Sequence, residues 1–151
     1  RDAEAALPRD LRPRGLDEAL QAMLRPHTVL AGGTDFYPAR VGHTISEDVL
    51  DVTSIPALRG ISAGPSSWRV GATVTWSELI ECELPPLFDG LKQAARDVGG
   101  RQIQNAGTLA GNLCNASPPA DGVPCLLALD AELEIASPKP PLRPSAALRI
   151  V

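Results

Sequence analysis

The sequence predicts an α+β fold, because segments with helical and with strand periodicity follow one another without strict alternation. Apolar residues recur at helical spacing in several segments, whereas the strand-like segments are short, and two of them flank a turn typical of a hairpin. A doubly wound sheet would require regular β–α alternation. The 151 residues are enough for one domain or for two small lobes that share a core.

The N-terminal region predicts a helix followed by a buried strand. Apolar residues at 16, 19, 20, 23 and 24 lie on one face of a helix over residues 16–24. Asp17 and Glu18 suit its first turn, where the helix dipole favours negative charge, and Pro26 follows its end. Residues 28–31, Thr-Val-Leu-Ala, are mostly apolar and run directly into a glycine pair, as a short buried strand does.

The segments after the glycine pair predict a short helix, a strand and a hairpin. A helix is expected to begin within residues 34–41 and to end at Gly42, and residues 49–52 are expected to form a strand. Residues 60–62 and 68–71 flank a turn of Ala, Gly, Pro and Ser. This arrangement is typical of an antiparallel hairpin.

The second half of the chain predicts three further helices and a strand around a glycine-rich stretch. Thr75 and Glu78 have the spacing of a capping box at the start of a helix. A second helix, over residues 91–98, ends at two glycines. Residues 124–129 predict a buried helix, and residues 131–136 alternate apolar and acidic side chains, as a half-buried strand does. The proline-rich residues that follow the strand predict a loop or linker.

Composition excludes several classes of function and suggests a division of the chain. The net charge of −4 and the aromatic content of 3% argue against a nucleic-acid partner, and the chain has no apolar run long enough to span a membrane. Three scattered cysteines do not fit an iron–sulfur or zinc site. We expect a cytoplasmic protein with a small N-terminal lobe over residues 1–58 and a larger lobe over residues 59–151.

The first candidate binding segment is the strand and glycine turn at residues 29–36. Glycines allow backbone angles that other residues avoid and let a ligand approach closely. Exposed amides in such a turn, before a helix, form an anion site without lysine, and a dinucleotide pyrophosphate fits it. Asp35 would repel phosphate, so it would cap the turn or accept hydrogen bonds from sugar hydroxyls.

The second candidate segment runs from Gly107 to Asp121 and is polar and rich in glycine. Thr108, Asn112 and Asn115, with Ser117, offer neutral hydrogen-bonding groups suited to a polyhydroxyl chain, and Asp121 is a strong acceptor. Such a stretch is costly to order unless it wraps a ligand. Taken alone, each segment is more simply explained as an ordinary turn, and neither matches the Rossmann or P-loop pattern.

Together, the two segments resemble a known family. The sequences LAGGTD at residues 30–35, RQIQNAGTLAGN at 101–112 and ASPPAD at 116–121, with VGATVTWSEL at 70–79, resemble the FAD-binding domain of molybdenum hydroxylases. These are the flavin subunits or domains of xanthine dehydrogenase, aerobic carbon monoxide dehydrogenase and their relatives. The resemblance spans residues 16–136, and its ordered motifs at matching separations make it specific.

The resemblance implies a two-lobed domain with FAD in the cleft between the lobes. The first segment would hold the pyrophosphate from the small lobe, and residues 108–112 would hold it from the larger lobe. Asp121 would accept hydrogen bonds from FAD hydroxyls, Val98 and Gly99 would lie near adenine, and Ile103 would pack beside the flavin. The implied cofactor-binding residues are Val29, Leu30, Ala31, Gly32, Gly33, Thr34, Asp35, Phe36, Val98, Gly99, Thr108, Leu109, Ala110, Gly111, Asn112, Asn115 and Asp121.

The resemblance also implies an electron-transfer role within a larger enzyme. Members of the family receive electrons from a molybdopterin-binding large subunit through a [2Fe–2S] small subunit, and their flavin then reduces NAD⁺, oxygen or another acceptor. The flavin carries the chemistry, so no side chain here needs to act as an acid, base or nucleophile. Neither His27 nor His43 has a plausible catalytic partner in sequence. The substrate, the acceptor and the stoichiometry are not determined by this sequence.

Two departures from the family keep alternatives open. Gln104 stands where many relatives carry arginine, which alters a loop contact. The family domain continues with further strands and a helical domain, so this chain is expected to be shortened at its C-terminus. The alternative is therefore a non-catalytic module that docks on a molybdopterin-containing partner without stable flavin. A covalent-flavin oxidase is disfavoured, because residues 29–41 contain no His or Cys.

Overall fold

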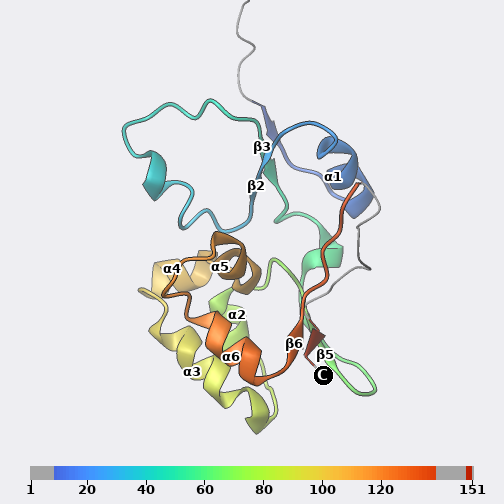
Figure 1. The fold of residues 1–151 in the computed structure, drawn as a ribbon, viewed down its shortest axis with the longest axis vertical. Coiled ribbons are helices and arrows are strands. Elements are labelled where there is room, and N and C mark those ends of the chain that lie inside the picture. Colours follow the sequence, from blue (N-terminus) through green and yellow to red (C-terminus); the bar gives the residue numbers. More distant parts are fainter. Residues whose placement is uncertain (1–8, 139–148, 151) are drawn as a thin grey trace, which may run out of the picture.

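The computed structural model describes residues 9–138 and the backbone of residues 149–150, and it mixes helices and strands, as predicted (Figure 1). Two sheets are present in the described part of the chain, one with three strands and one with four. Most of the helices follow the hairpin in the sequence, and Figure 1 shows them gathered on one side of the molecule. The proline-rich segment after Ser137 lies mostly outside the described residues.

The first sheet is parallel, with the strand order β1 (Asp10–Leu11), β3 (Val49–Asp51) and β2 (Thr28–Leu30). Helix α1 (Leu16–Ala22) connects β1 to β2 and confirms the predicted N-terminal helix. Strand β1 was not expected, because two residues are too few to show a periodic pattern. The core of this part consists of Ala19, Leu50 and Ile55, with partly buried apolar side chains around them.

The segment between β2 and β3 does not form the predicted helix over residues 34–41. It makes a turn and then a single 3-10 turn, η1 (Pro38–Arg40), before Gly42, whose φ is +81°. Tyr37 and Ala39 donate backbone hydrogen bonds to residues four positions earlier, as in a helix. Pro38 has no N–H to continue this pattern, which explains why the helix does not form.

The second sheet is antiparallel and begins with the predicted hairpin. Its order is β4 (Ile61–Ala63), β5 (Trp68–Val70), β7 (Arg149–Ile150) and β6 (Ala131–Glu132). A further 3-10 turn, η2 (Pro56–Leu58), precedes the hairpin. The strand predicted over residues 131–136 extends only to Glu132. The side chains of Leu133 and Ile135 are exposed, so the alternating pattern has no buried face to pack against there.

The helices of the second part surround a larger core. They are α2 (Trp76–Glu81), η3 (Pro86–Phe88), α3 (Asp89–Asp97), α4 (Arg101–Ala106), α5 (Leu109–Asn115) and α6 (Gly122–Ala128). Helices α4 and α5 lie between residues 101 and 115, where the sequence predicted no helix. The largest fully buried side chains in this core are Trp76, Phe88, Leu79, Leu91, Leu109 and Val74.

Local sequence signals explain several helix boundaries. Thr75 and Glu78 form the predicted capping box at the start of α2, each side chain accepting a hydrogen bond from the backbone N–H of the other. Helix α6 confirms the predicted helix, although only one of its faces is buried: Leu126 is 4% exposed and Leu127 is 76% exposed. None of the helices in the described part is long and apolar enough to cross a bilayer.

Candidate functional site

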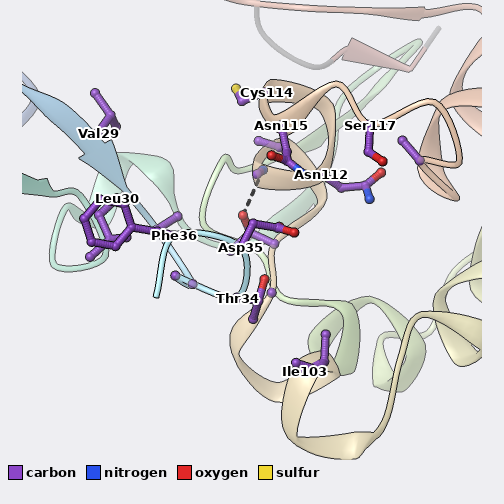
Figure 2. A pocket seen from close by; sticks show the side chains of 18 of the residues that line it. Val29, Leu30, Thr34, Asp35, Phe36, Ile103, Asn112, Cys114, Asn115 and Ser117 are labelled. Atoms are coloured by element: carbon purple, nitrogen blue, oxygen red, sulfur yellow. Dashed lines mark hydrogen bonds between the residues drawn. The ribbon is translucent and has the colours of Figure 1, made fainter. Parts of the chain in front are cut away.

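A cavity of about 760 Å³ lies where the turn after β2 meets helices α4 and α5 (Figure 2). This volume is within the range of small-molecule and cofactor pockets. Residues from both parts of the chain line it, and Figure 2 shows labelled side chains of both segments around it. The lining residues are Thr28, Val29, Leu30, Ala31, Gly32, Gly33, Thr34, Asp35, Phe36, Ala39, Arg40, Val52, Ala72, Trp76, Val98, Ile103, Gly107, Thr108, Ala110, Gly111, Asn112, Cys114, Asn115, Ser117, Pro119, Ala120 and Asp121.

Most of the residues singled out in the sequence therefore lie around one cavity. Gly33 and Gly111, one from each glycine segment, both line it, as do Val98 and Ile103. Leu109, the first residue of α5, does not line the cavity, because its side chain points into the core and is fully buried. Gly99 also lies outside the lining set. Its φ of +50° ends α3 and lets the chain turn into α4, which gives this glycine a structural role.

The turn after β2 presents a run of open backbone amides. Within the described part of the chain, the N–H groups of residues 32–36 donate to no protein acceptor. The turn closes through the bond from the Tyr37 N–H to the Gly33 oxygen, at 3.1 Å, and Gly33 has a φ of +69°. Consecutive unpaired amides in such a turn resemble the first turn of a helix and favour an anion.

The role of Gly32 differs from the expected one. The sequence suggested that this glycine lets a ligand approach the backbone. In the structure, a Cβ on Gly32 would lie 1.9 Å from the carbonyl oxygen of Ala106, at the end of α4. A Cβ on Gly107 would lie 3.4 Å from Thr34 Oγ1, which is an ordinary contact distance, and 3.0 Å from the carbonyl oxygen of Ile103. Of the two glycines, Gly32 is therefore the one that the contact between the turn and α4 requires.

The second glycine segment is held by hydrogen bonds of its own. Thr108 caps α5, and its Oγ1 accepts from the Gly111 N–H at 2.9 Å. The Leu109 N–H donates to the Val74 oxygen at 3.1 Å, whereas the Ala110 N–H has no acceptor in the described part. The buried Thr108 hydroxyl therefore organises the start of α5. Thr108 was not identified as a helix cap in the sequence, because the glycines that follow it are unfavourable in helices and no helix was predicted there.

The carboxylates of Asp35 and Asp121 line the cavity without a hydrogen-bond partner among the described residues, whereas the side-chain amide of Asn112 has one. Asn112 Oδ1 accepts from the Gly122 N–H at 3.3 Å and so ties α5 to the start of α6. Asp121, directly before α6, and Asp35 are both exposed and make no side-chain hydrogen bond to the described residues. Asp35 therefore does not cap the turn, which was one of the two roles expected for it, and both carboxylates are available to accept hydrogen bonds from a ligand.

Arg40 lines the cavity and was missed in the sequence. Its Nε donates to Glu47 Oε1 at 2.9 Å, its Nη1 donates to the Phe36 oxygen at 3.0 Å, and its Nη2 also bonds Glu47. The guanidinium lies 3.8 Å from the centre of the Phe36 ring. The hydrogen bond from Arg40 holds the pKa of the Glu47 carboxyl below its usual range. In the sequence, Arg40 is distinguished only as the first basic residue after the glycine pair, and that position alone does not indicate a binding role.

Gln104, noted as a departure from the family, lies on α4 and not in a loop. Its Nε2 donates to the carbonyl oxygen of Arg96 on α3, at 2.9 Å. The side chain therefore helps to join these two helices. In the described part of the chain, no group of three or more His, Cys, Asp and Glu side chains is arranged to hold a metal ion.

Relatives of this chain are flavin subunits of dehydrogenases. It is 37% identical over 114 residues to the xanthine dehydrogenase FAD-binding subunit of Escherichia coli O157:H7, a match that covers 74% of this chain and 39% of that protein. It is 31% identical over 134 residues to the nicotinate dehydrogenase FAD-subunit of Eubacterium barkeri, covering 83% of this chain and 44% of that one. The chain thus spans less than half the length of these relatives.

Solved structures with a similar fold come from carbon monoxide dehydrogenases. A chain of the Hydrogenophaga pseudoflava enzyme lacking the Mo-pyranopterin moiety matches with a TM-score of 0.75 and 22% identity, covering 97% of this chain and 59% of that one. A chain of the reconstituted Oligotropha carboxidovorans enzyme matches with a TM-score of 0.78 and 21% identity, covering 96% and 59%. At these identities the likeness shows the fold alone.

A sequence model of one family covers nearly the whole chain. The family is described as the FAD binding domain in molybdopterin dehydrogenase, and its model matches residues 9–146. This range contains both glycine segments and the helices that carry them. The match confirms the resemblance drawn from the motifs: the chain belongs to the FAD-binding domain family of the molybdopterin dehydrogenases.

Proposed function

We propose that this chain binds FAD in the cavity between a small lobe, residues 1–58, and a larger lobe, residues 59–151. The observation that carries the proposal is the run of open amides at residues 32–36, which borders the same cavity as the start of α5. A diphosphate needs several N–H donors at once, and this turn offers them without a lysine. The family of the chain supports the same cofactor.

The residues around the cavity fit the parts of FAD. The amides of the first turn and of Ala110 would hold the diphosphate, and the free carboxylates of Asp35 and Asp121 would accept from sugar or ribityl hydroxyls. Ile103, partly exposed on α4, would pack beside the flavin ring, and Val98 would lie near the adenine. Leu109 would support the site only through its position in the core.

The chain would serve as the flavin component of a larger oxidoreductase. FAD accepts and donates one or two electrons, so it can connect one-electron iron–sulfur centres to a two-electron acceptor such as NAD. The protein's own residues would bind and orient the flavin and exclude water. The partners would be a molybdopterin-binding large subunit, which the description of the matched family supports, and the [2Fe–2S] small subunit that the motif resemblance implies. A cytosolic location stays a prediction.

Flavin content tests this proposal. Purified protein should be yellow, should keep its visible flavin absorbance through gel filtration and should be bleached by dithionite. The flavin should be released on denaturation, whereas retention would indicate a covalent link. Protein that is colourless and that also fails to take up added FAD would contradict the proposal. It would support the alternative of a docking module without stable flavin.

A further inference from the structure

Among the described residues that line the cavity, Arg40 has the only cationic side chain. The other charged groups there are the carboxylates of Asp35 and Asp121. An anionic diphosphate that enters this cavity therefore meets two like charges and one opposite charge. Backbone amides provide hydrogen bonds but only partial charge, so the guanidinium of Arg40 is the main source of full positive charge in the site.

The environment of Arg40 fixes its guanidinium before any ligand arrives. Glu47 accepts from Nε and Nη2, and the Phe36 oxygen accepts from Nη1. The ring of Phe36 lies under the guanidinium, at 3.8 Å from its centre, and the Arg40 side chain is 29% exposed. A side chain held on three sides has already lost much of its rotamer freedom, so binding a ligand would cost little further entropy.

The hydrogen bonds of Arg40 leave part of its donor capacity unused. A guanidinium has five N–H donors, of which three are engaged here, one each on Nε, Nη1 and Nη2. One donor therefore remains on each of the two terminal nitrogens. Two such donors on one planar group can bind two oxygens of a phosphate. The ammonium group of lysine lacks this planar arrangement of donors.

Phe36 connects Arg40 to the open amides. The Phe36 N–H is one of the five unpaired amides of the first turn, while its carbonyl oxygen and ring both contact the guanidinium. We propose that Arg40 is a cofactor-binding residue that provides the counter-charge for the FAD diphosphate, with Glu47 holding it in place and reducing its available charge. This inference rests on the proposed function. It adds a residue that would favour binding of FAD over flavins without phosphate, such as riboflavin.

The test compares two ligands that differ in phosphate. FAD and riboflavin share the isoalloxazine ring and the ribityl chain, but only FAD carries the diphosphate. Titrations followed by flavin fluorescence quenching would give Kd for both ligands with the wild-type chain and with Arg40→Gln. We expect the FAD Kd to rise about tenfold to a hundredfold, as for loss of charge-assisted hydrogen bonds. The riboflavin Kd should change by less than about twofold, since it has no phosphate to lose.

Two further variants separate a charge effect from a structural one. Arg40→Lys keeps the charge without the planar fork, so its FAD Kd should fall between those of wild type and Arg40→Gln. Glu47→Gln releases the guanidinium charge, so FAD should bind at least as tightly as to the wild type. If Arg40→Gln does not fold, as judged by circular dichroism, these two variants decide the question through the same titrations.

The outcomes distinguish this inference from the proposed function. A wild-type chain that binds no FAD overturns both. A wild-type chain that binds FAD, with Arg40→Gln affecting FAD and riboflavin equally or not at all, overturns the role of Arg40 alone. Glu47→Gln weakening FAD as strongly as Arg40→Gln would also overturn it, because the ion pair would then act only as a brace for the loop.

Discussion

Gly32 and Ala106 touch backbone to backbone: a Cβ on Gly32 would lie 1.9 Å from the Ala106 carbonyl oxygen. Gly32 begins the turn of open amides, and Ala106 ends the helix that carries Ile103. The contact therefore sets the position of the turn relative to α4. Figure 1 shows α4 and α5 beside the chain that leaves β2. A single glycine thus joins the part of the cavity proposed for the diphosphate to the part proposed for the flavin ring.

This contact predicts that Gly32→Ala destabilises the protein. The added methyl group would meet backbone atoms, which cannot rotate away as a side chain does. Overpacking of this kind costs about 1–3 kcal/mol in the free energy of unfolding. FAD affinity should fall as well, because the turn would be displaced. Denaturant titration and flavin titration would measure the two effects.

Gly90→Ala is the matched control, since a Cβ at Gly90 has no neighbour within 4 Å and the residue lies in helix α3. Alanine in a helix is slightly favoured over glycine, so this variant should be as stable as the wild type or more so. Wild-type stability in Gly32→Ala would show that the turn and α4 are not in such close contact.

A second prediction concerns Asp121, whose exposed side chain has no hydrogen-bond partner in the described part. Asp121→Ala should leave stability nearly unchanged, because no protein contact is lost. It should weaken FAD binding about tenfold to a hundredfold, as expected for lost hydrogen bonds to a charged acceptor. Asp97→Ala, an exposed aspartate outside the cavity lining, is the control. Equal FAD affinity in both variants would remove Asp121 from the site.

A third prediction concerns Thr108, whose buried hydroxyl caps α5. Thr108→Ala should lower the free energy of unfolding by about 1 kcal/mol through loss of the cap. It should also weaken FAD binding, because the start of α5 borders the cavity. Thr108→Ser keeps the hydroxyl and should restore both properties. Thr75→Ala removes the cap of α2. Thr75 lies outside the lining set but pairs with Thr108, so this variant should reduce stability and should lower FAD affinity less than Thr108→Ala does. Similar losses of FAD affinity in Thr75→Ala and Thr108→Ala would contradict a local role for α5.

Sequence reasoning succeeded where the signal was local. The capping box at Thr75 and the hairpin of β4 and β5 depend on neighbouring residues, and both are present as expected. Strand β1 exists because it pairs with β3, about forty positions away, and no local pattern reports such a partner. Helix α5 was missed because glycine and asparagine are poor helix formers, and packing of Leu109 against the core outweighs that preference.

The sequence predicted which residues line the candidate site better than it predicted what each of them does there. Residues 29–36 and most of residues 108–121 do line one cavity. The contact that requires Gly32 comes from α4, which is remote in sequence, so the sequence alone favoured a ligand as its reason. Arg40 was missed because its importance depends on the absence of other cations around the cavity, and this is known only once the lining residues are assembled.

The last prediction concerns Asp48, which lies directly before β3. Its carboxylate accepts from the Arg9 N–H at 2.9 Å and from the Arg9 guanidinium, and the buried ring of His27 lies 3.9 Å away. The bond from the Arg9 backbone contributes most to lowering the pKa of the Asp48 carboxyl in the folded state. These three residues each directly precede a strand of the parallel sheet, so the cluster joins the strands at that edge.

A carboxyl whose pKa is lower when folded stabilises the protein above its unfolded pKa, which is about 3.9 for aspartate. That contribution is lost as the pH falls through the lower, folded-state pKa. Asp48→Asn should therefore be less stable than the wild type at pH 7, and the difference should shrink as the pH falls below about 4. Thermal unfolding from pH 3 to pH 7 measures this, with Asp97→Asn as the control because Asp97 makes no ion pair with the described residues. If the difference in stability between the wild type and Asp48→Asn stays constant from pH 3 to pH 7, the Arg9 contact does not favour the ionised form of the Asp48 carboxyl.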